Sequence, residues 1–214
     1  MSERVKGNSS TRSLFICFVL VVALVLQTVV RPEPAVAVTM TSEIGPHLFT
    51  STMSWQAAQR VYVVAHMTVP ADVERVWAVL TDYENLEDYM PHLDKSEVLQ
   101  RDTDRLTLHQ EGSFWLPLIR LKSATTMEVR EDPPLVIAFR ATEGDYEVYE
   151  GTWRLQPTPE GTDLFYEAVI EPRFHVPRCV LSAVERKILK GTFEAVLSRS
   201  SELKQLRLAQ NQKS

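Results

Sequence analysis

The sequence predicts an α+β domain in which a curved, seven-stranded antiparallel sheet wraps around a long C-terminal helix, with two short helices after the first strand. Three patterns support this prediction. β-Branched and apolar residues fill 60–69, and apolar residues then recur with the period of a helix. From 95 to 171 the period changes to two, and apolar residues at helical spacing return after 177. This order of elements is typical of an α+β layout.

The first strand and helix adjoin each other. The segment "RVYVVAHMTV", residues 60–69, has the composition of a strand and stops at Pro70. In the following "ADVERVWAVL", four apolar residues lie three or four positions apart, as on one face of a helix: Val73, Val76, Trp77 and Leu80. Asp72 stands where an N-cap residue is expected. A helix with one face committed to the core should therefore begin near residue 73.

Six further strands and a final helix follow. Turn-like clusters cut the region with period two into strand-sized pieces: 95–101, 105–115, 120–131, 135–142, 146–157 and 163–172. The connections are too short for crossover helices, so we expect antiparallel hairpins. Pro177 suits the start of a helix, and helical spacing continues to about Leu208.

The N-terminal region resembles an export signal or a membrane anchor. Residues 14–30, "LFICFVLVVALVLQTVV", carry no charge and follow Arg4, Lys6 and Arg12. The "AVA" at 35–37 has the small-x-small form that signal peptidases cut. We expect cleavage after Ala37 or retention as an anchor, and in both cases a domain outside the cytoplasm. The remaining boundaries are a linker over 38–58, the folded domain over 59–209 and a tail over 210–214.

Composition excludes several classes of function. Residues 38–214 hold 19 basic and 26 acidic side chains, a poor balance for binding nucleic acid. The two cysteines predict no disulfide, because Cys17 lies inside the signal segment and leaves Cys179 alone. The histidines show no metal-ligand spacing, and no hydrolase, metalloprotease, P-loop or dinucleotide motif occurs. We expect a monomer without a metal or cofactor.

An acidic segment, "TDYENLEDYMPHLD" at 81–94, admits three interpretations. Asp88 and His92 are four residues apart, as two metal ligands on a helix would be, but Pro91 between them disfavours that helix. A catalytic carboxylate would need a pocket that raises its pKa, whereas crowded acids more often lie on a solvated surface. The third interpretation is a gate beside a cavity, and it depends on the resemblance described next.

Several motifs resemble the START-like, or helix-grip, superfamily, in particular its coenzyme Q-binding START-domain family and its polyketide cyclase/dehydrase relatives. The motifs are "VPADVERVWAVLTDYENLEDYMPHLDKSEVL" (69–99), "EGDYEVYEGTWRL" (143–155), "GTDLFYEAVIEP" (161–172) and the "VP" at 176–177. The resemblance covers about residues 60–208. It implies an apolar cavity under the long helix that holds a lipid, an isoprenoid quinone or a similar hydrophobic molecule.

The cavity candidates combine this implication with strand alternation, since residues of one parity face the interior. In the acidic segment, apolar and aromatic residues should turn inward as a gate. The candidate ligand-binding residues are Trp77, Tyr83, Leu86, Tyr89, Met90, Leu108, Gln110, Phe114, Ser123, Thr125, Met127, Phe139, Tyr149, Trp153, Tyr166 and Ile188. The competing interpretation is a solid core in which these side chains only pack against one another.

Three functions follow as expectations. The first is an exported carrier that shields a hydrophobic ligand without covalent chemistry, with a membrane surface as a second partner through the Trp115, Pro117 and Leu118 bend. The second is a polyketide-type cyclase or dehydratase, with His109, Gln110, Tyr149 or Tyr166 positioning the substrate. The third is a non-catalytic accessory protein of a membrane complex that keeps its N-terminal segment.

Overall fold

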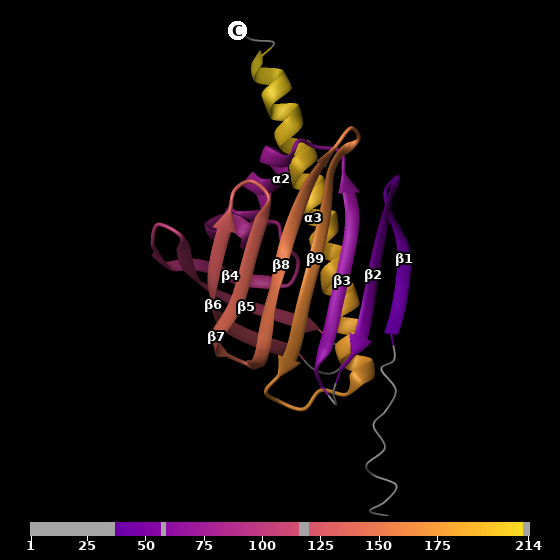
Figure 1. The fold of residues 1–214 in the computed structure, drawn as a ribbon, viewed down its shortest axis with the longest axis vertical. Helices are drawn as coiled ribbons and strands as arrows, with labels where there is room; N and C mark the ends of the chain where they lie inside the picture. Colours follow the sequence, from indigo (N-terminus) through magenta and orange to yellow (C-terminus); the bar gives the residue numbers. More distant parts are fainter. Residues whose placement is uncertain (1–36, 57–58, 116–119, 212–214) are drawn as a thin grey trace, which may run out of the picture. The chain divides into compact units, whose positions relative to one another are not determined.

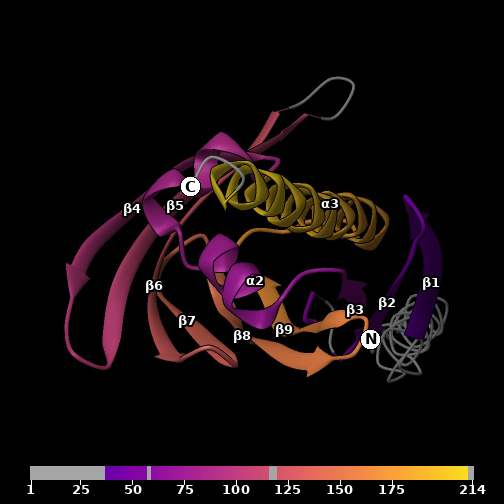
Figure 2. The ribbon, with the colours of Figure 1, turned by 90° about the horizontal axis from the view of Figure 1, so that it is seen from above.

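One curved antiparallel sheet encloses the helices of the domain. The computed structural model describes residues 37–56, 59–115 and 120–211. In this part of the chain, nine strands follow the order β1-β2-β3-β9-β8-β7-β6-β5-β4, and the concave face covers α2 and α3 (Figures 1 and 2). The strands are β1 (Ala37–Ile44), β2 (His47–Trp55), β3 (Val61–Val69), β4 (Leu93–Arg101), β5 (Arg105–Trp115), β6 (Arg120–Asp132), β7 (Val136–Gly144), β8 (Tyr146–Thr158) and β9 (Gly161–Pro172). The helices are α2 (Val73–Leu80), the 3-10 helix η1 (Tyr83–Asp88) and α3 (Arg178–Asn211).

Two strands lie where the sequence predicts a linker, so the expectations of a linker over 38–58 and of seven strands were wrong. β1 and β2 pair as a hairpin, and β2 pairs with β3, which extends the sheet beyond the predicted domain boundary. Gly45, with a φ of 58°, and Pro46 form the turn between them rather than marking a loose segment. Burial alternates from Phe49 to Trp55, but the serines and threonines of β2 weaken that signal in the sequence.

The remaining predicted elements are confirmed to within a few residues. Six consecutive strands run from β4 to β9, and each pairs with its neighbour in an antiparallel ladder. Asp72 caps α2, because its Oδ1 accepts a hydrogen bond from the Arg75 N–H at 3.0 Å. The final helix extends to Asn211 and includes the first residues of the predicted tail.

The expectations about the N-terminal segment are not tested by the fold. Residues 14–30 and the expected cleavage site at 35–37 lie outside the described residues, apart from Ala37. None of the helices in the described part of the chain combines the length and the apolar character needed to cross a membrane.

The inner face of α3 packs on the centre of the sheet. Phe193 is fully buried, and its ring lies 5.0 Å from the ring of Phe49 in β2 and 5.5 Å from that of Trp153 in β8. Val196, one turn further along α3, is also fully buried. The hairpin of β1 and β2 is thus part of the hydrophobic core, because Phe49 supplies one side of this aromatic contact.

Two tyrosines fix η1 to its neighbours. The hydroxyl group of Tyr83 donates a hydrogen bond to Glu131 Oε1 at 2.8 Å, and that of Tyr89 donates one to the carbonyl oxygen of Val79 at 2.6 Å. Burial is the main cause that raises the pKa of both phenols, and it raises the pKa of Tyr89 to about 12. Both rings therefore serve the packing of η1 as neutral hydrogen-bond donors.

If β1 and β2 belong to the core, truncating Phe49 should destabilise the domain. We expect Phe49→Ala to lower the free energy of unfolding by about 3 to 5 kcal/mol, as large-to-small changes of buried aromatic residues do. Urea unfolding measures this change. Val38→Ala is the control in the same hairpin, because Val38 is 42% exposed and should cost less than about 0.5 kcal/mol. Equal effects of the two variants would contradict the assignment of Phe49 to the core.

The raised pKa of Tyr89, the C-cap residue of η1, predicts that the stability of the domain depends on pH. At pH 8, Tyr89→Phe should lower the free energy of unfolding by about 1 kcal/mol through loss of the bond to Val79. The folded-state pKa of Tyr89 lies above the unfolded value, so this contribution is complete below about pH 10 and declines between about pH 10 and 12. The difference between wild type and Tyr89→Phe should thus shrink from pH 8 to pH 11. The titration of the tyrosines that both proteins share cancels in the comparison. A difference in unfolding free energy that stays constant from pH 8 to pH 11 would argue against the raised pKa of Tyr89.

Candidate functional site

A cavity with two adjoining lobes lies between α3 and the β5–β6 side of the sheet. The larger lobe measures about 240 Å³ and the smaller about 90 Å³. The lobes share five lining residues and therefore lie side by side: His92, Gly112, Ser123, Tyr146 and Ile188. The pair approaches the size of pockets that hold small organic ligands, about 300 to 1,000 Å³.

The larger lobe is bounded by four strands, α3 and the turn before β4. Strands β5, β6, β8 and β9 supply inward side chains of mixed character, including Gln110, Thr125, Trp153 and Tyr166. Leu189 and Thr192 approach from α3, and Met90 and Leu93 from the turn. Apolar rings and aliphatic chains alternate here with hydroxyl and amide groups, as is usual for sites that orient a mainly apolar molecule.

The smaller lobe is more apolar. Phe114 and Leu121 line it from the ends of β5 and β6, and Leu181 and Val184 from the first turns of α3. Phe174, in the loop between β9 and α3, is 43% exposed and also lines this lobe. The smaller lobe therefore reaches the surface beside an exposed aromatic ring.

The turn that bounds the larger lobe is held from both sides. The His92 carbonyl oxygen accepts a hydrogen bond from the Ser113 N–H at 3.0 Å, and Glu87 Oε2 accepts one from the Ser96 N–H at 2.6 Å. On the helix side, a Cβ atom at Gly191 would lie 2.8 Å from Pro91 Cγ. Since glycine leaves room for the proline ring, the turn packs closely against α3.

Ten of the sixteen predicted residues line the cavity. The structure brings together residues from η1 and the turn, four strands and α3, and it places their side chains around one space. They are Leu86, Met90, Gln110, Phe114, Ser123, Thr125, Tyr149, Trp153, Tyr166 and Ile188.

The other six pack elsewhere, and for them the prediction of a lining position was wrong. Leu108, Met127 and Phe139 are buried in the continuous hydrophobic core, with exposures of 3%, 4% and 8%. Alternation correctly put them on the concave face, but that face is filled by packed side chains at their level along the strands. Trp77 packs against the same core from α2.

The two tyrosines of the predicted gate also do not line the cavity. Tyr83 is directed to Glu131 and Tyr89 to the end of α2, and the guanidinium of Arg199 in α3 lies 5.3 Å from the Tyr89 ring. Met90 and Leu86 are the members of this segment that line the larger lobe. Hydrogen bonding decides the difference, because each buried phenol takes a fixed acceptor whereas the thioether needs none.

His92 is a cavity residue that the sequence prediction missed. Its φ of 66° is left-handed, which is uncommon for a residue other than glycine, and its ring lies 4.8 Å from the ring of Phe114. Leu80, Tyr146 and Leu189 are further residues that the prediction missed. The position of His92 in "MPHL", directly after a proline, was a usable signal for a turn but not for its direction.

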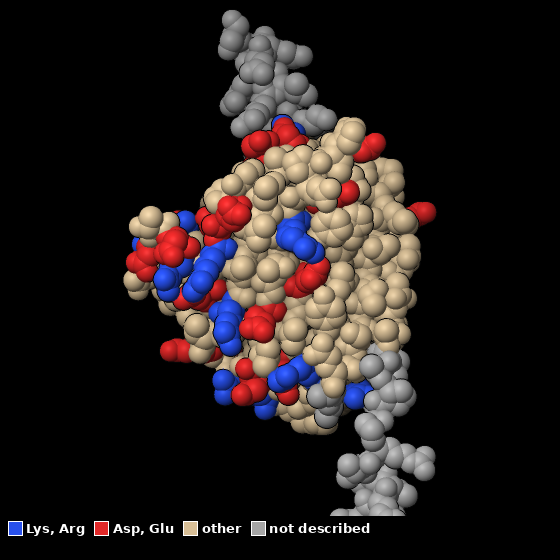
Figure 3. Space-filling view, viewed as in Figure 1, with Lys and Arg blue, Asp and Glu red and all other residues tan. Residues whose placement is uncertain are grey.

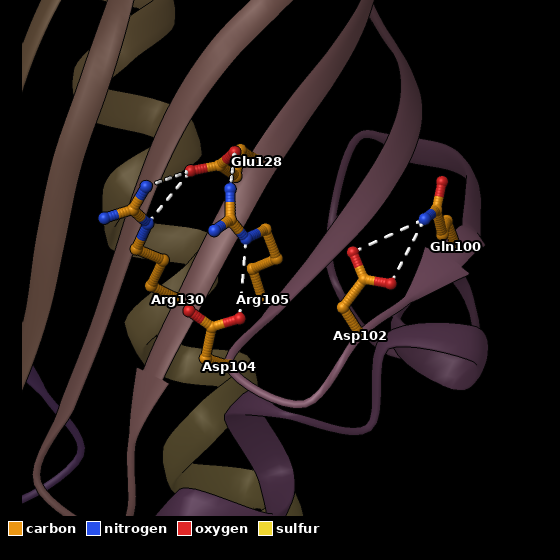
Figure 4. A network of polar contacts seen from close by, with 6 residues as sticks. All are labelled: Gln100, Asp102, Asp104, Arg105, Glu128 and Arg130. Carbon is orange, nitrogen blue, oxygen red and sulfur yellow. Dashed lines mark hydrogen bonds and ion pairs between the residues drawn. The ribbon is translucent and has the colours of Figure 1, made fainter.

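The charged side chains near the β4–β6 edge are engaged with one another at the surface. Glu128 accepts from Arg105 at 3.4 Å and from Arg130 at 2.9 Å, and Gln100 donates to Asp102 at 3.2 Å (Figure 4). Acids and bases are interspersed over the left and lower parts of the face in Figure 3, and the right side of that face is mostly uncharged. Among the described residues, no group of three histidine, cysteine or acidic side chains is arranged to hold a metal ion.

The bend between β5 and β6 is described only in part. Trp115 is 68% exposed, and the guanidinium of Arg120 lies 5.3 Å from its ring centre. Pro117 and Leu118 lie outside the described residues, so the expectation that this bend meets a membrane stays a prediction.

Comparisons with solved structures match this architecture. The protein TTHA0849 from Thermus thermophilus aligns at 26% identity with a TM-score of 0.54, covering 66% of this chain and 94% of that one. The Zhui aromatase/cyclase from Streptomyces sp. R1128 aligns at 22% identity with a TM-score of 0.58 and the same coverages. A STAR-related lipid transfer protein from Xanthomonas axonopodis aligns at 16% identity with a TM-score of 0.60, covering 76% and 98%. At identities this low, the last two show the fold alone.

A family model agrees with them. No curated protein matches the chain. The family described as polyketide cyclase / dehydrase and lipid transport matches residues 69–196, more than half of the chain. That stretch runs from the end of β3 to the middle of α3 and includes most of the cavity lining. The START-like resemblance is thus confirmed, and the protein belongs to the polyketide cyclase/dehydrase and lipid transport family.

Proposed function

We propose that this protein binds a hydrophobic small molecule, an isoprenoid quinone or another membrane lipid, in the cavity under α3 and carries it without changing it covalently. The observation that supports this most directly is the pair of adjoining lobes. Protein interiors are close-packed, so a space of this size between helix and sheet is a feature of binding proteins rather than of solid cores. The structural neighbour from Xanthomonas axonopodis is named as a lipid transfer protein, which supports the same proposal.

Apolar burial would supply most of the affinity. A chain that passes from the exposed Phe174 into the smaller lobe removes its surface from water against Leu121, Leu181 and Val184. Each methylene buried in this way contributes about 0.8 kcal/mol. Loading and release require access to the lobes, which the turn around Pro91 and the start of α3 border.

A cyclase or dehydratase is the second candidate, and one observation favours it. His92 lines both lobes and could exchange a proton with a bound polyketone, and the Zhui neighbour bears the name of an aromatase/cyclase. The larger lobe holds no aspartate, lysine or arginine among its described lining residues, and the side chain of its glutamate, Glu111, is 51% exposed and lies beside His109 on the other face of the sheet. A proton-transfer site there would depend on His92 and the tyrosines alone, and for this reason we place the carrier first.

We also propose that the domain works outside the cytoplasm, after export directed by residues 1–37 or while anchored by them. The uncharged run at 14–30 and the "AVA" at 35–37 support this location. The mature protein from its native host should begin at Val38 if the segment is cleaved. N-terminal sequencing of that protein measures it, and a chain that begins at residue 1 in a soluble fraction would contradict both forms of the proposal.

Blocking the cavity from α3 should abolish binding. Ile188 is half-buried and lines both lobes, so Ile188→Phe fills the space between them. We expect at least a tenfold drop in the ligand recovered per mole of protein, measured by mass spectrometry after mild organic extraction. The free energy of unfolding should change by less than about 1.5 kcal/mol, because the added ring enters existing space.

Ile188→Val is the matched control and should retain the ligand. Recovery of the same amount of ligand from Ile188→Phe would place the ligand outside this cavity. Recovery of a substrate and a product that differ by one water molecule would favour the dehydratase instead.

A further inference from the structure

We infer that the ligand is an uncharged amphiphile, with an oxygen-bearing head in the larger lobe held by Ser123 and His92, and with an apolar chain in the smaller lobe. This inference rests on the proposed function and narrows its ligand class. It comes from the charge of the lining, from two polar side chains at the junction of the lobes, and from the difference between the lobes.

The larger lobe offers an ionic head no inward-facing charge among its described lining residues. Among the described residues that line the larger lobe, Glu111 is the one with a charged side chain, and strand alternation directs it to the convex face. There its Oε1 lies 3.4 Å from His109 Nε2, and its side chain is 51% exposed. Alternation also directs Lys122, which borders the smaller lobe, away from the cavity. Lys187 Nζ lies 5.1 Å from the ring centre of Phe114, on the side of the smaller lobe. An anionic or cationic head in the larger lobe would therefore lose its hydration without gaining a partner.

Two polar groups at the junction are available to a ligand. Within the described part of the chain, the Ser123 hydroxyl and the His92 ring nitrogens have no hydrogen-bond partner, and both residues line both lobes. Gln110, deeper in the larger lobe, donates its amide hydrogen to Ser96 Oγ at 3.2 Å, which leaves the amide oxygen as an acceptor. Half-enclosed polar groups normally find partners, and a hydroxyl or carbonyl oxygen on the ligand provides them.

The backbone places these two residues beside the same glycine. A Cβ atom at Gly112 would be 2.8 Å from the backbone carbonyl oxygen of His92 and 3.8 Å from Ser123 Oγ. The left-handed conformation of His92 costs free energy, and such residues cluster at functional sites. The hydrogen bond from the Ser113 N–H to its carbonyl oxygen holds the residue in place. The absent side chain and the strained turn together leave space beside the hydroxyl and the imidazole.

The lobes differ in the way that an amphiphile requires. Three residues that line the larger lobe alone carry hydroxyl groups beside its apolar side chains: Thr125, Tyr149 and Tyr166. The smaller lobe is lined instead by Phe114, Leu181 and Val184 and opens beside Phe174. Quinones, sterols and neutral polyketides fit this arrangement, whereas ionised fatty acids and the phosphate of a phospholipid do not.

Ligands that share a ten-carbon alkyl chain and differ in the charge of the head group test the inference. We would titrate the purified, delipidated protein with 1-decanol, decanoate and decylammonium at pH 7.5 by calorimetry. Decanol should bind at least tenfold more tightly than either ion. Equal affinities for the alcohol and an ion would overturn the inference but leave the carrier function standing. Failure of all three to bind, together with no lipid in the extract of the native protein, would instead count against the proposed function.

A pair of serine variants tests the position of the head. Ser123→Ala should weaken decanol binding about three- to tenfold, the usual effect of losing one hydrogen bond, and should leave the affinity for decane unchanged. Ser54→Ala, in β2 and away from the cavity, is the matched control and should change neither. An equal loss for decanol and decane in Ser123→Ala would indicate a packing defect and contradict a hydrogen bond to the head.

Discussion

The packing of α3 against the concave face of the sheet is the constraint on which the rest of the structure depends. A nearly straight helix can touch a strongly curved sheet closely along only part of its width. Here the close contact is at β2 and β8, where Phe193 meets Phe49 and Trp153 with no exposure of its ring. Towards β5 and β6 the facing residues include Gly112 and Ser123, which are too small to fill the gap. The cavity therefore lies where small residues of β5 and β6, rather than large ones, face α3.

The packing of α3 also positions the turn between η1 and β4. Pro91 packs against Gly191 of α3 while the His92 carbonyl oxygen is bonded to β5, so the turn bridges helix and sheet over the cavity. The two tyrosines that fix η1 do not line the cavity. Tyr83 donates a hydrogen bond to Glu131 in β6, and Tyr89 donates one to the carbonyl oxygen of Val79 in α2.

The fold by itself does not assign a function to this chain. The same helix-grip architecture is found here in neighbours named as lipid transfer proteins and as an aromatase/cyclase. In this chain the charged side chains at the lining, such as Glu111 and Lys122, are directed outward by strand alternation. Our proposal of a carrier follows from this, because a lining of that kind offers few groups to stabilise charge that develops in a reaction.

The sequence by itself determined the order of the elements from β3 to α3, the face of each strand that turns inward, and the family, because hydrophobic period and motif order are local properties. It did not reveal β1 and β2, whose serines and threonines weaken the alternation and whose Gly45 and Pro46 imitate a linker. Only the tertiary structure decided which inward residues line a cavity. Leu108 and Ser123 both lie on the concave face, yet one is buried in the solid core and the other borders open space. That difference depends on the distance between α3 and each strand and on the conformation of the turn at Pro91 and His92. Both are set by contacts between segments that are far apart in the sequence, so no single segment predicts them.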